Sequence, residues 1–159
     1  MVKLNLGCGD QILSGFINTD QINRSGAVGD DIIFLGKFKD STVEMLYASH
    51  CLQCIQRSYV FEALRNWYRV LISGGKIIIE VPDIISLMGK YLKGLISIET
   101  LTQGVYGVDK EGIRQTCCFD YDYLKKLLEE VGFKDVKRIP QPFYSRHDLN
   151  TNICVEATK

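Results

Sequence analysis

Two glycines flank a cysteine where an apolar run near the start of the sequence ends, in the segment LNLGCGD at positions 4–10. Because glycine has no side chain, a ligand can approach the backbone N–H groups of Gly7 and Gly9 closely. A dinucleotide-binding fold would carry a third glycine three residues after Gly9 and an acid about 20 residues farther on. Ile12 occupies the first of these positions, and Asp20 comes too early. The spacing therefore disfavours a nicotinamide-dependent oxidoreductase and indicates a glycine turn of another kind.

A histidine and two cysteines follow a later apolar run. His50 is either a base or substrate contact, or a structural histidine whose hydrogen bonds are satisfied. Cys51 and Cys54 have Cys-x-x-Cys spacing, but no second spaced pair accompanies them, because Cys117 and Cys118 are adjacent. A structural zinc site needs four ligands, so we predict no metal, and we expect these cysteines to be buried thiols.

Further polar and aromatic residues lie where a substrate could reach them. They belong to the glycine-containing stretch around 104–116 and to the loop before the last apolar run, and they are Tyr106, Arg114, Tyr121, Tyr144, Arg146 and His147. A solvated surface is the competing interpretation for all of them.

Apolar periodicity predicts an alternating α/β chain that positions these residues. Strands are expected over 3–7, 16–20, 30–35, 43–48, 76–81, 133–139 and 152–157. A helix is expected over 57–72 and stopped by Gly74 and Gly75, and another begins at Asp120 or Asp122 and ends at Gly132. The run 76–81 is nearly all apolar, which is typical of a central strand covered on both faces. The region 84–119 has helical character interrupted by glycines, which favours a lid or substrate-binding insertion.

Composition narrows the class of protein. The 159 residues predict one domain, 1–159, and 46% hydrophobic content is enough for a full core. Lysine plus arginine and aspartate plus glutamate both number 19, so no basic excess favours nucleic acid. The apolar runs are too short to span a membrane, and the sequence opens on a strand rather than on an export signal. Six scattered cysteines then suggest reduced thiols and a cytoplasmic protein.

Several blocks together resemble the class I S-adenosylmethionine (SAM)-dependent methyltransferases, in particular the short type 11-like domains. The matching blocks keep their order along nearly the whole chain, and they are Gly7-Cys8-Gly9, the segment 15–20 (GFINTD), the segment 47–50 (YASH), the segment 67–76 (WYRVLISGGK) and the segment 123–133 (YLKKLLEEVGF). The resemblance implies a three-layer Rossmann-like fold, with a mostly parallel sheet, helices on both faces and an antiparallel strand near the C-terminus.

The resemblance also implies a cofactor site and a reaction. It implies contacts to SAM from the residues Asn5, Gly7, Cys8, Gly9, Asp10, Asp20, Ser49 and His50. Asp20 would accept hydrogen bonds from both ribose hydroxyls, and Asp10 would face the ammonium group. The reaction implied is methyl transfer to a small-molecule or sugar-derived acceptor, with S-adenosylhomocysteine (SAH) as product and His50 as a candidate base. Closure of the site would come from 84–119 or from a second subunit in a homodimer.

Two departures from these relatives motivate another interpretation. The segment 33–38 lacks the acid that relatives place after the third strand to meet the adenine amino group. Gln53 and Cys54 stand where relatives carry glutamate and histidine. The alternative function is therefore a degenerate, non-catalytic domain that binds a partner or senses SAM.

Overall fold

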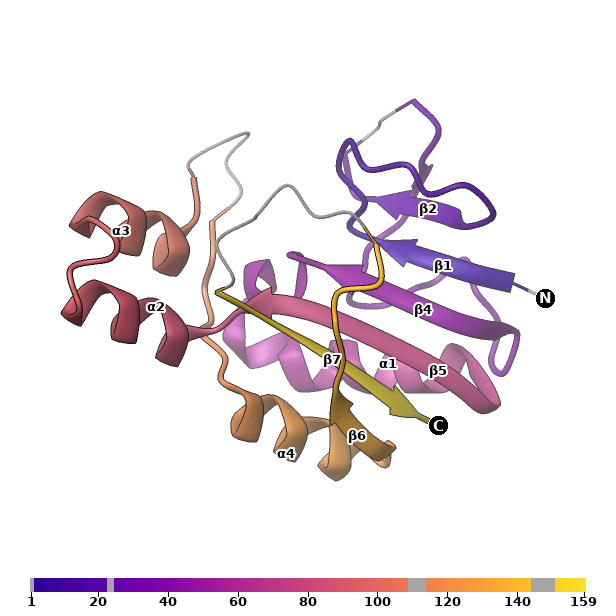
Figure 1. Cartoon of the computed structure of the whole chain (residues 1–159). Helices are drawn as coiled ribbons and strands as arrows, with labels where there is room; N and C mark the ends of the chain where they lie inside the picture. Colours follow the sequence, from indigo (N-terminus) through magenta and orange to yellow (C-terminus); the bar gives the residue numbers. More distant parts are fainter. Residues whose placement is uncertain (1, 23–24, 109–113, 144–150) are drawn as a thin grey trace.

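The computed structural model describes residues 2–22, 25–108, 114–143 and 151–159 (Figure 1). Its centre is a seven-stranded sheet with the order β3-β2-β1-β4-β5-β7-β6. The strands are β1 (Val2–Leu6), β2 (Ile17–Asp20), β3 (Val28–Gly29), β4 (Val43–Ser49), β5 (Leu71–Pro82), β6 (Lys134–Arg138) and β7 (Asn152–Thr158). The strands β1 to β5 pair in parallel, whereas β7 runs antiparallel to both β5 and β6. The predicted fold class, a mostly parallel sheet with an antiparallel C-terminal strand, is confirmed.

Short and medium helices connect the strands. They are the 3₁₀ turns η1 (Leu52–Cys54) and η2 (Arg57–Tyr59) and the helices α1 (Val60–Val70), α2 (Ile84–Leu92), α3 (Ile98–Tyr106) and α4 (Tyr121–Val131). The predicted caps of α4 are confirmed, because the Asp120 carboxylate accepts the Tyr123 N–H and Gly132 ends the helix in the left-handed conformation. Within the described part of the chain, no helix has the length and apolar character needed to cross a membrane.

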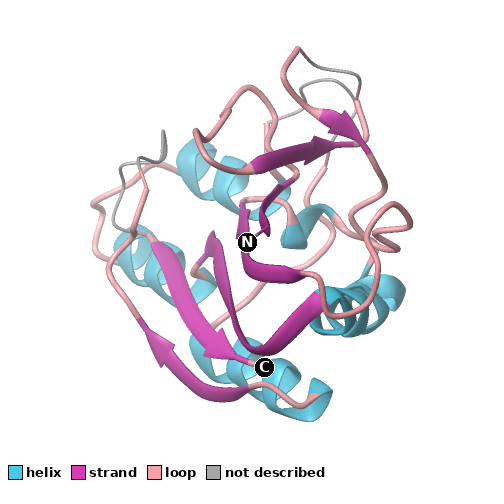
Figure 2. Ribbon diagram, turned by 90° about the vertical axis from the view of Figure 1, so that its right-hand side faces the viewer, coloured by secondary structure: helices cyan, strands magenta, loops and turns pink. Residues whose placement is uncertain are grey.

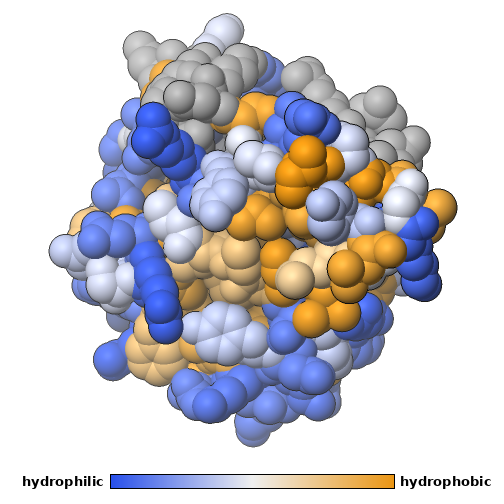
Figure 3. All heavy atoms as spheres, turned by 90° about the vertical axis from the view of Figure 1, so that its left-hand side faces the viewer, coloured by the Kyte–Doolittle hydropathy of each residue, from blue (hydrophilic) through white to orange (hydrophobic). Residues whose placement is uncertain are grey.

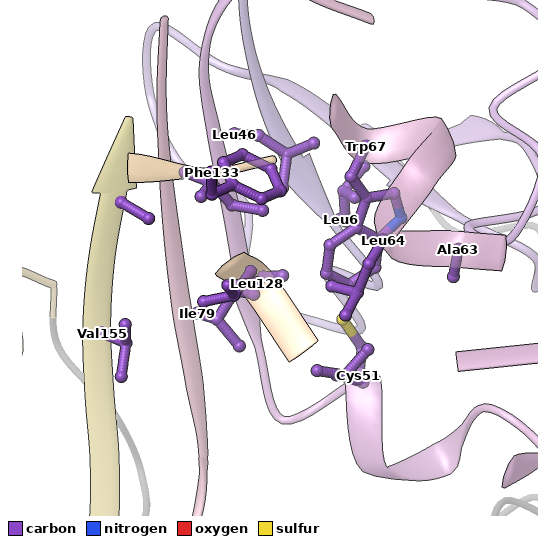
Figure 4. Packing of buried hydrophobic residues seen from close by; sticks show 14 of the residues in the cluster. Leu6, Leu46, Cys51, Ala63, Leu64, Trp67, Ile79, Leu128, Phe133 and Val155 are labelled. Carbon is purple, nitrogen blue, oxygen red and sulfur yellow. The ribbon is translucent and has the colours of Figure 1, made fainter. Parts of the chain in front are cut away.

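The main core lies between one face of the sheet and the helices α1 and α4. Trp67 and Leu64 of α1 and Leu128 of α4 are fully buried, and they pack with Leu46 and Ile79 of the sheet (Figure 4). Burying each such side chain contributes about 1.5–3 kcal/mol to folding. This layer fixes β4 and β5, whose carboxyl ends carry part of the candidate site.

The opposite face of the sheet is covered differently. Its smaller apolar cluster contains Tyr47, Ile78 and Cys154, and loop residues rather than helices pack on it in the described part of the chain. Phe143 contacts both Phe16 and Tyr47, with ring centroids 5.6 and 4.8 Å apart. The connection 7–16 between β1 and β2 contains no helix. Figure 2, turned to view the sheet from the amino end of β1, shows the twist of the strands and the loops beside them.

The strand predicted over 30–35 is wrong, because this segment is a turn held by α1. The third strand is the short β3, and the carbonyl of Ile32 accepts a hydrogen bond from the Trp67 indole at 2.6 Å. Arg69 donates to the carbonyls of Phe34 and Leu35. The carbonyls that a strand would pair with its neighbour are used by side chains of α1 instead.

The helix predicted over 57–72 is shorter than expected. It begins as η2 and ends at Val70, and the glycines at 74 and 75 lie inside β5 rather than at a helix end. Ser41 and Thr42 donate their N–H groups to the carbonyls of Arg69 and Val70, which ends α1 before the glycines. The pairing of β4 with β5 shifts register across these glycines, so they form a bulge.

The insertion after β5 forms a hairpin of α2 and α3 at the carboxyl ends of the parallel strands (Figure 1). The break near Gly94 that the sequence predicts is present, although α3 runs on to Tyr106. Of its helical residues only Leu87 is buried, and it approaches Gly104 of α3 closely. Figure 3 shows apolar side chains on this side of the molecule, and the exposed ones in the hairpin are Ile85, Met88, Tyr91, Leu92, Leu95, Ile98 and Tyr106.

Candidate functional site

The glycine turn begins where β1 ends. Gly7 and Gly9 have φ values of +57° and +52°, in the left-handed region that glycine adopts without strain. A Cβ on Gly7 would lie 2.5 Å from the Cβ of Cys51, so no side chain fits there. A Cβ on Gly9 would meet no atom within 4 Å. Gly7 therefore allows the turn to pack on η1, while the space that a side chain of residue 9 would occupy is open. Cys8 is buried between them.

Asp20 ties this turn to the neighbouring strand. It is the last residue of β2 and is 7% exposed. Its Oδ2 accepts the Gly9 N–H at 2.8 Å, and its Oδ1 accepts the Ile22 N–H at 2.9 Å. A carboxylate has about four lone-pair sites, so both oxygens can accept further hydrogen bonds from a ligand. Asp20 therefore has the chemistry to bind a diol beside the glycine turn.

Asn5 stabilises the connection between β1 and β2 through side-chain hydrogen bonds. Its amide donates to the carbonyl of Gln11 and to Oδ1 of Asn18, both at 2.8 Å. The same Asn18 oxygen accepts the Leu13 N–H at 2.9 Å. Both amide hydrogens of Asn5 are thus used to shape the loop, which makes it a positioning residue. Asp10 is exposed.

Two acids follow the third strand, and their carboxylates accept N–H groups of the same turn. Because β3 is Val28–Gly29, the residues directly after it are Asp30 and Asp31. Asp30 donates its N–H to the Asp20 carbonyl at 3.2 Å, so the two acids are close along the same sheet edge. The strand predicted over 30–35 would hide these acids inside it, which is why the sequence analysis found no acid after the third strand.

A second cluster of polar side chains lies at the carboxyl ends of β4 and β5, around Glu80. This residue is fully buried. Its Oε2 accepts hydrogen bonds from Tyr47 Oη at 3.1 Å, Ser49 Oγ at 3.0 Å and Gln141 Nε2 at 3.0 Å. Its Oε1 accepts Asn152 Nδ2 at 3.0 Å. The Ser49 hydroxyl, predicted to contact the cofactor, is directed to this carboxylate.

His50 is held against the same carboxylate. Its Nε2 lies 3.2 Å from Asn152 Nδ2 and 3.6 Å from Glu80 Oε1. Its backbone N–H donates to the Glu80 carbonyl at 2.9 Å. Its φ is +53°, an uncommon value for a residue with a side chain, and such strain is found at functional sites. The imidazole is 17% exposed, so it connects a sealed carboxylate with the surface.

The electrostatics of this cluster favour an ionised Glu80. Burial acts to raise the pKa of Glu80, but hydrogen bonds from His50, Ser49 and Tyr47, with the charge of His50, outweigh it and hold that pKa below its ordinary value. Burial also raises the pKa of Tyr47, so its hydroxyl keeps its proton and donates it. The result is a buried carboxylate surrounded by donors.

The six cysteines all lie in the described part of the chain. All six are free thiols. Burial raises the pKa of Cys51, and it raises the pKa of Cys54 to about 11, which keeps both thiols protonated and poorly nucleophilic. Among the described residues, no group of three or more metal-ligating side chains is gathered in one place.

Sequence patterns alone did not indicate that Glu80, Asn152, Tyr47 and Gln141 belong to the site. The signal for Glu80 was present, because an acid inside the apolar run 77–81 of a central strand needs partners. Asn152 lies 102 positions from His50, so no local pattern could have joined them. The candidate contacts Tyr144, Arg146 and His147 lie outside the described residues.

The two clusters are neighbours on one sheet edge. Leu6 of β1 pairs with Ala48 of β4, and Ser49 pairs with Glu80 of β5. Open parallel sheets bind ligands in the crevice outside the carboxyl ends of their strands, at the point where the strand order reverses. The glycine turn, Asp20 and His50 therefore line one continuous edge.

Solved structures share this architecture. A SAM-dependent methyltransferase from Archaeoglobus fulgidus matches 99% of this chain and 85% of its own with a TM-score of 0.65 and 19% identity. One from Thermotoga maritima matches 99% and 82%, with a TM-score of 0.71 and 17% identity. The 1,6-didemethyltoxoflavin-N1-methyltransferase of Burkholderia thailandensis, solved with its substrate and SAH, matches 99% and 70%, with a TM-score of 0.65 and 15% identity.

At the level of sequence, no protein-family model and no curated protein matches the chain. The identities to the solved structures are low, but the matches extend over nearly the whole chain. The chain therefore has the fold of the class I SAM-dependent methyltransferases.

Proposed function

We propose that the protein transfers a methyl group from SAM to a small-molecule or sugar-derived acceptor. The observation that carries this proposal is the pairing of the Gly9 N–H with the Asp20 carboxylate at the carboxyl ends of β1 and β2. This contact places the Asp20 carboxylate, which can accept hydrogen bonds from hydroxyl groups, beside a glycine with open space next to it. The strand order β3-β2-β1-β4-β5-β7-β6 brings both to the carboxyl ends of neighbouring strands.

Each part of the cofactor has a fitting neighbour in this proposal. Asp20 accepts the ribose hydroxyls, the Gly7 and Gly9 backbone lies under the sugar and the methionine part, and Asp10 faces the ammonium group. Asp30 and Asp31 are the acids that can accept the adenine amino group. Their position after β3 supports an intact cofactor site over the degenerate domain.

Methyl transfer from SAM mainly requires the protein to align the acceptor with the methyl group. Bound SAM supplies a methyl group on a positively charged sulfur, which is already a good electrophile. The chain contributes by holding the acceptor in line and by excluding water, for which the hairpin of α2 and α3 is the candidate cover. The methyltransferase from Burkholderia thailandensis was solved with bound 1,6-didemethyltoxoflavin and SAH, which supports a small-molecule acceptor.

The test is calorimetric titration of the wild-type protein with SAM and SAH, repeated on Asp20→Ala and on Glu130→Ala. Micromolar binding, or about 8 kcal/mol, is expected for the wild type and for Glu130→Ala, because the Glu130 side chain is on the exposed face of α4. Asp20→Ala should bind about 10- to 100-fold more weakly, because charged hydrogen bonds are lost. No binding to the wild type at millimolar ligand would contradict the proposal. Tight binding without methyl transfer to any metabolite in a cell extract would favour the cofactor-sensing alternative.

A further inference from the structure

The helix α2 is apolar on more than one face. Its nine residues include one charged side chain, Lys90, yet Leu87 is the only residue among them that is buried. The helices α1 and α4, in contrast, carry several charged residues on their exposed faces. A helix that is apolar on most of its circumference is normally enclosed by other protein. The exposed surface of α2 therefore indicates that a further element packs on it.

The spacing of its residues gives α2 two apolar faces. Leu87 packs against α3, because a Cβ on Gly104 would lie 2.8 Å from its side chain. Ile85, Met88 and Leu92 are three and four positions apart, which places them on one face of the helix. With about 3.6 residues per turn, this face is roughly a third of a turn away from Leu87. One apolar face of α2 thus lies on α3, and the other is exposed.

The helix α3 repeats this spacing. Ile98 is exposed, and Leu101 and Val105, three and seven positions farther on, are half-buried. Apolar residues with this spacing form the seam along which helices pack on one another. We call the two sets together the hairpin stripe, which consists of Ile85, Met88, Leu92, Ile98, Leu101 and Val105. Figure 3 shows apolar side chains gathered on the side of the molecule where the hairpin lies.

The amount of exposed apolar surface fits a partner protein. The seven large apolar residues of the hairpin that are exposed have exposed fractions between 39% and 80%. With about 200 Å² for each such side chain, their exposed surface is on the order of 800 Å². The largest apolar patch of a typical monomer is about 300–600 Å². Each partner in a stable protein–protein interface contributes about 800 Å², so the hairpin exposes enough surface for a stable dimer.

The charged residues of the hairpin favour a second copy of the chain over a membrane or a nucleic acid. Residues 84–106 carry Lys90, Lys93 and Glu99. Helices that lie on membranes are rich in lysine and arginine on their polar face, and nucleic-acid binding needs a basic patch. Lys93 and Glu99 are exposed and have opposite signs, so two hairpins can meet without net repulsion.

We propose that the hairpin stripe is the interface of a homodimer, in which the stripes of two copies pack on each other about a two-fold axis. Four short helices then share one apolar core, as they do in a helix bundle. Since the hairpin lies at the carboxyl ends of the parallel strands, the dimer holds it beside the candidate site. The proposal rests on the surface of the hairpin and does not depend on SAM binding.

Sedimentation equilibrium of the full chain without ligand tests the proposal. We expect the wild type to be a dimer at micromolar concentration. Leu92→Lys places a charge in the stripe of both copies and should weaken dimerisation about 100-fold, whereas Leu92→Met, which keeps the apolar volume, should retain the dimer. The matched control is Gln103→Lys, which adds the same charge to an exposed position on the side of α3 away from Ile98 and should dimerise as the wild type does. Far-UV circular dichroism checks that each variant is folded.

Amide hydrogen exchange identifies the face that forms the dimer. The amides of α2 and α3 should exchange more slowly in the concentrated wild type than after dilution or in Leu92→Lys, while those of β6 exchange equally in all three samples. A wild type that is monomeric at tens of micromolar, equal dimerisation of the wild type and Leu92→Lys, or a dimer that protects only amides outside the hairpin would overturn the proposal. A monomer that binds phospholipid vesicles through the hairpin would assign the stripe to a membrane surface and overturn it as well.

Discussion

Asp20 and Glu80 both lie at the carboxyl ends of parallel strands, yet different partners hold their carboxylates. Asp20 accepts backbone N–H groups from Gly9 and Ile22, which come from segments near it in the sequence. The Oε2 atom of Glu80 accepts hydrogen bonds from the side chains of Tyr47, Ser49 and Gln141, and the residue is sealed from solvent. An acid that shapes a loop can also meet a ligand, whereas a sealed acid can act only by holding another side chain.

The largest expected effect is at Glu80. Glu80→Ala leaves several buried donors without an acceptor, and we expect the free energy of unfolding to fall by about 3–5 kcal/mol. Urea denaturation measures this loss, and the exposed Glu130→Ala serves as control with a change within about 0.5 kcal/mol. A loss under about 1 kcal/mol for Glu80→Ala would mean that the cluster does not hold together as described.

The variants Gly7→Ala and Gly9→Ala, in the turn beside Asp20, distinguish an effect on packing from an effect on ligand access. Alanine at either position costs about 1–2 kcal/mol for the left-handed backbone. Gly7→Ala also forces Cys51 to move, which adds about 1–3 kcal/mol, while Gly9→Ala meets open space. We expect Gly7→Ala to be the less stable variant and Gly9→Ala to lose SAH binding while remaining folded. Equal stability of the two would contradict the close contact with η1.

The smallest expected effect is the pH dependence of the Glu80 contribution. The pKa of Glu80 in the folded protein is below its ordinary value of 4.5, so its ionised form stabilises the fold above that pH. This contribution is lost as the pH falls through the lowered folded value. The difference in unfolding free energy between the wild type and Glu80→Gln should therefore be largest near neutral pH and shrink below about pH 4.5. A difference that grows on acidification would have the wrong sign.

Sequence patterns predicted the parts of the fold and site that depend on near neighbours. The glycine turn, Asp20 at a strand end and the caps of α4 all follow from residues a few positions apart. The end of α1 and the turn at 31–38 were mispredicted, because Arg69 and Trp67 bind backbone carbonyls some 30 positions away. Apolar residues in that turn are buried by α1, so their pattern imitates a strand.

The cluster around Glu80 could not be predicted from the sequence, because its contacts also join residues far apart in the chain. It joins residues from β4, β5, β7 and the loop after β6, and its pairs are separated by 31 to 102 positions. Predicting it would have required the sheet order first. Only His50 and Ser49 could be selected from the sequence, and the structure places both side chains beside Glu80.

The measurement that tests the account most directly is a backbone amide NMR titration with SAH. We predict that the amide signals of Gly7, Gly9 and Ile22 shift together as SAH binds, because the N–H groups of Gly9 and Ile22 donate to the Asp20 carboxylate and Gly7 belongs to the same turn. The signals of β6, on the far edge of the sheet, should stay in place. Shifts confined to β6 or the absence of any shift at Gly7 and Gly9 would contradict the assignment of the cofactor site.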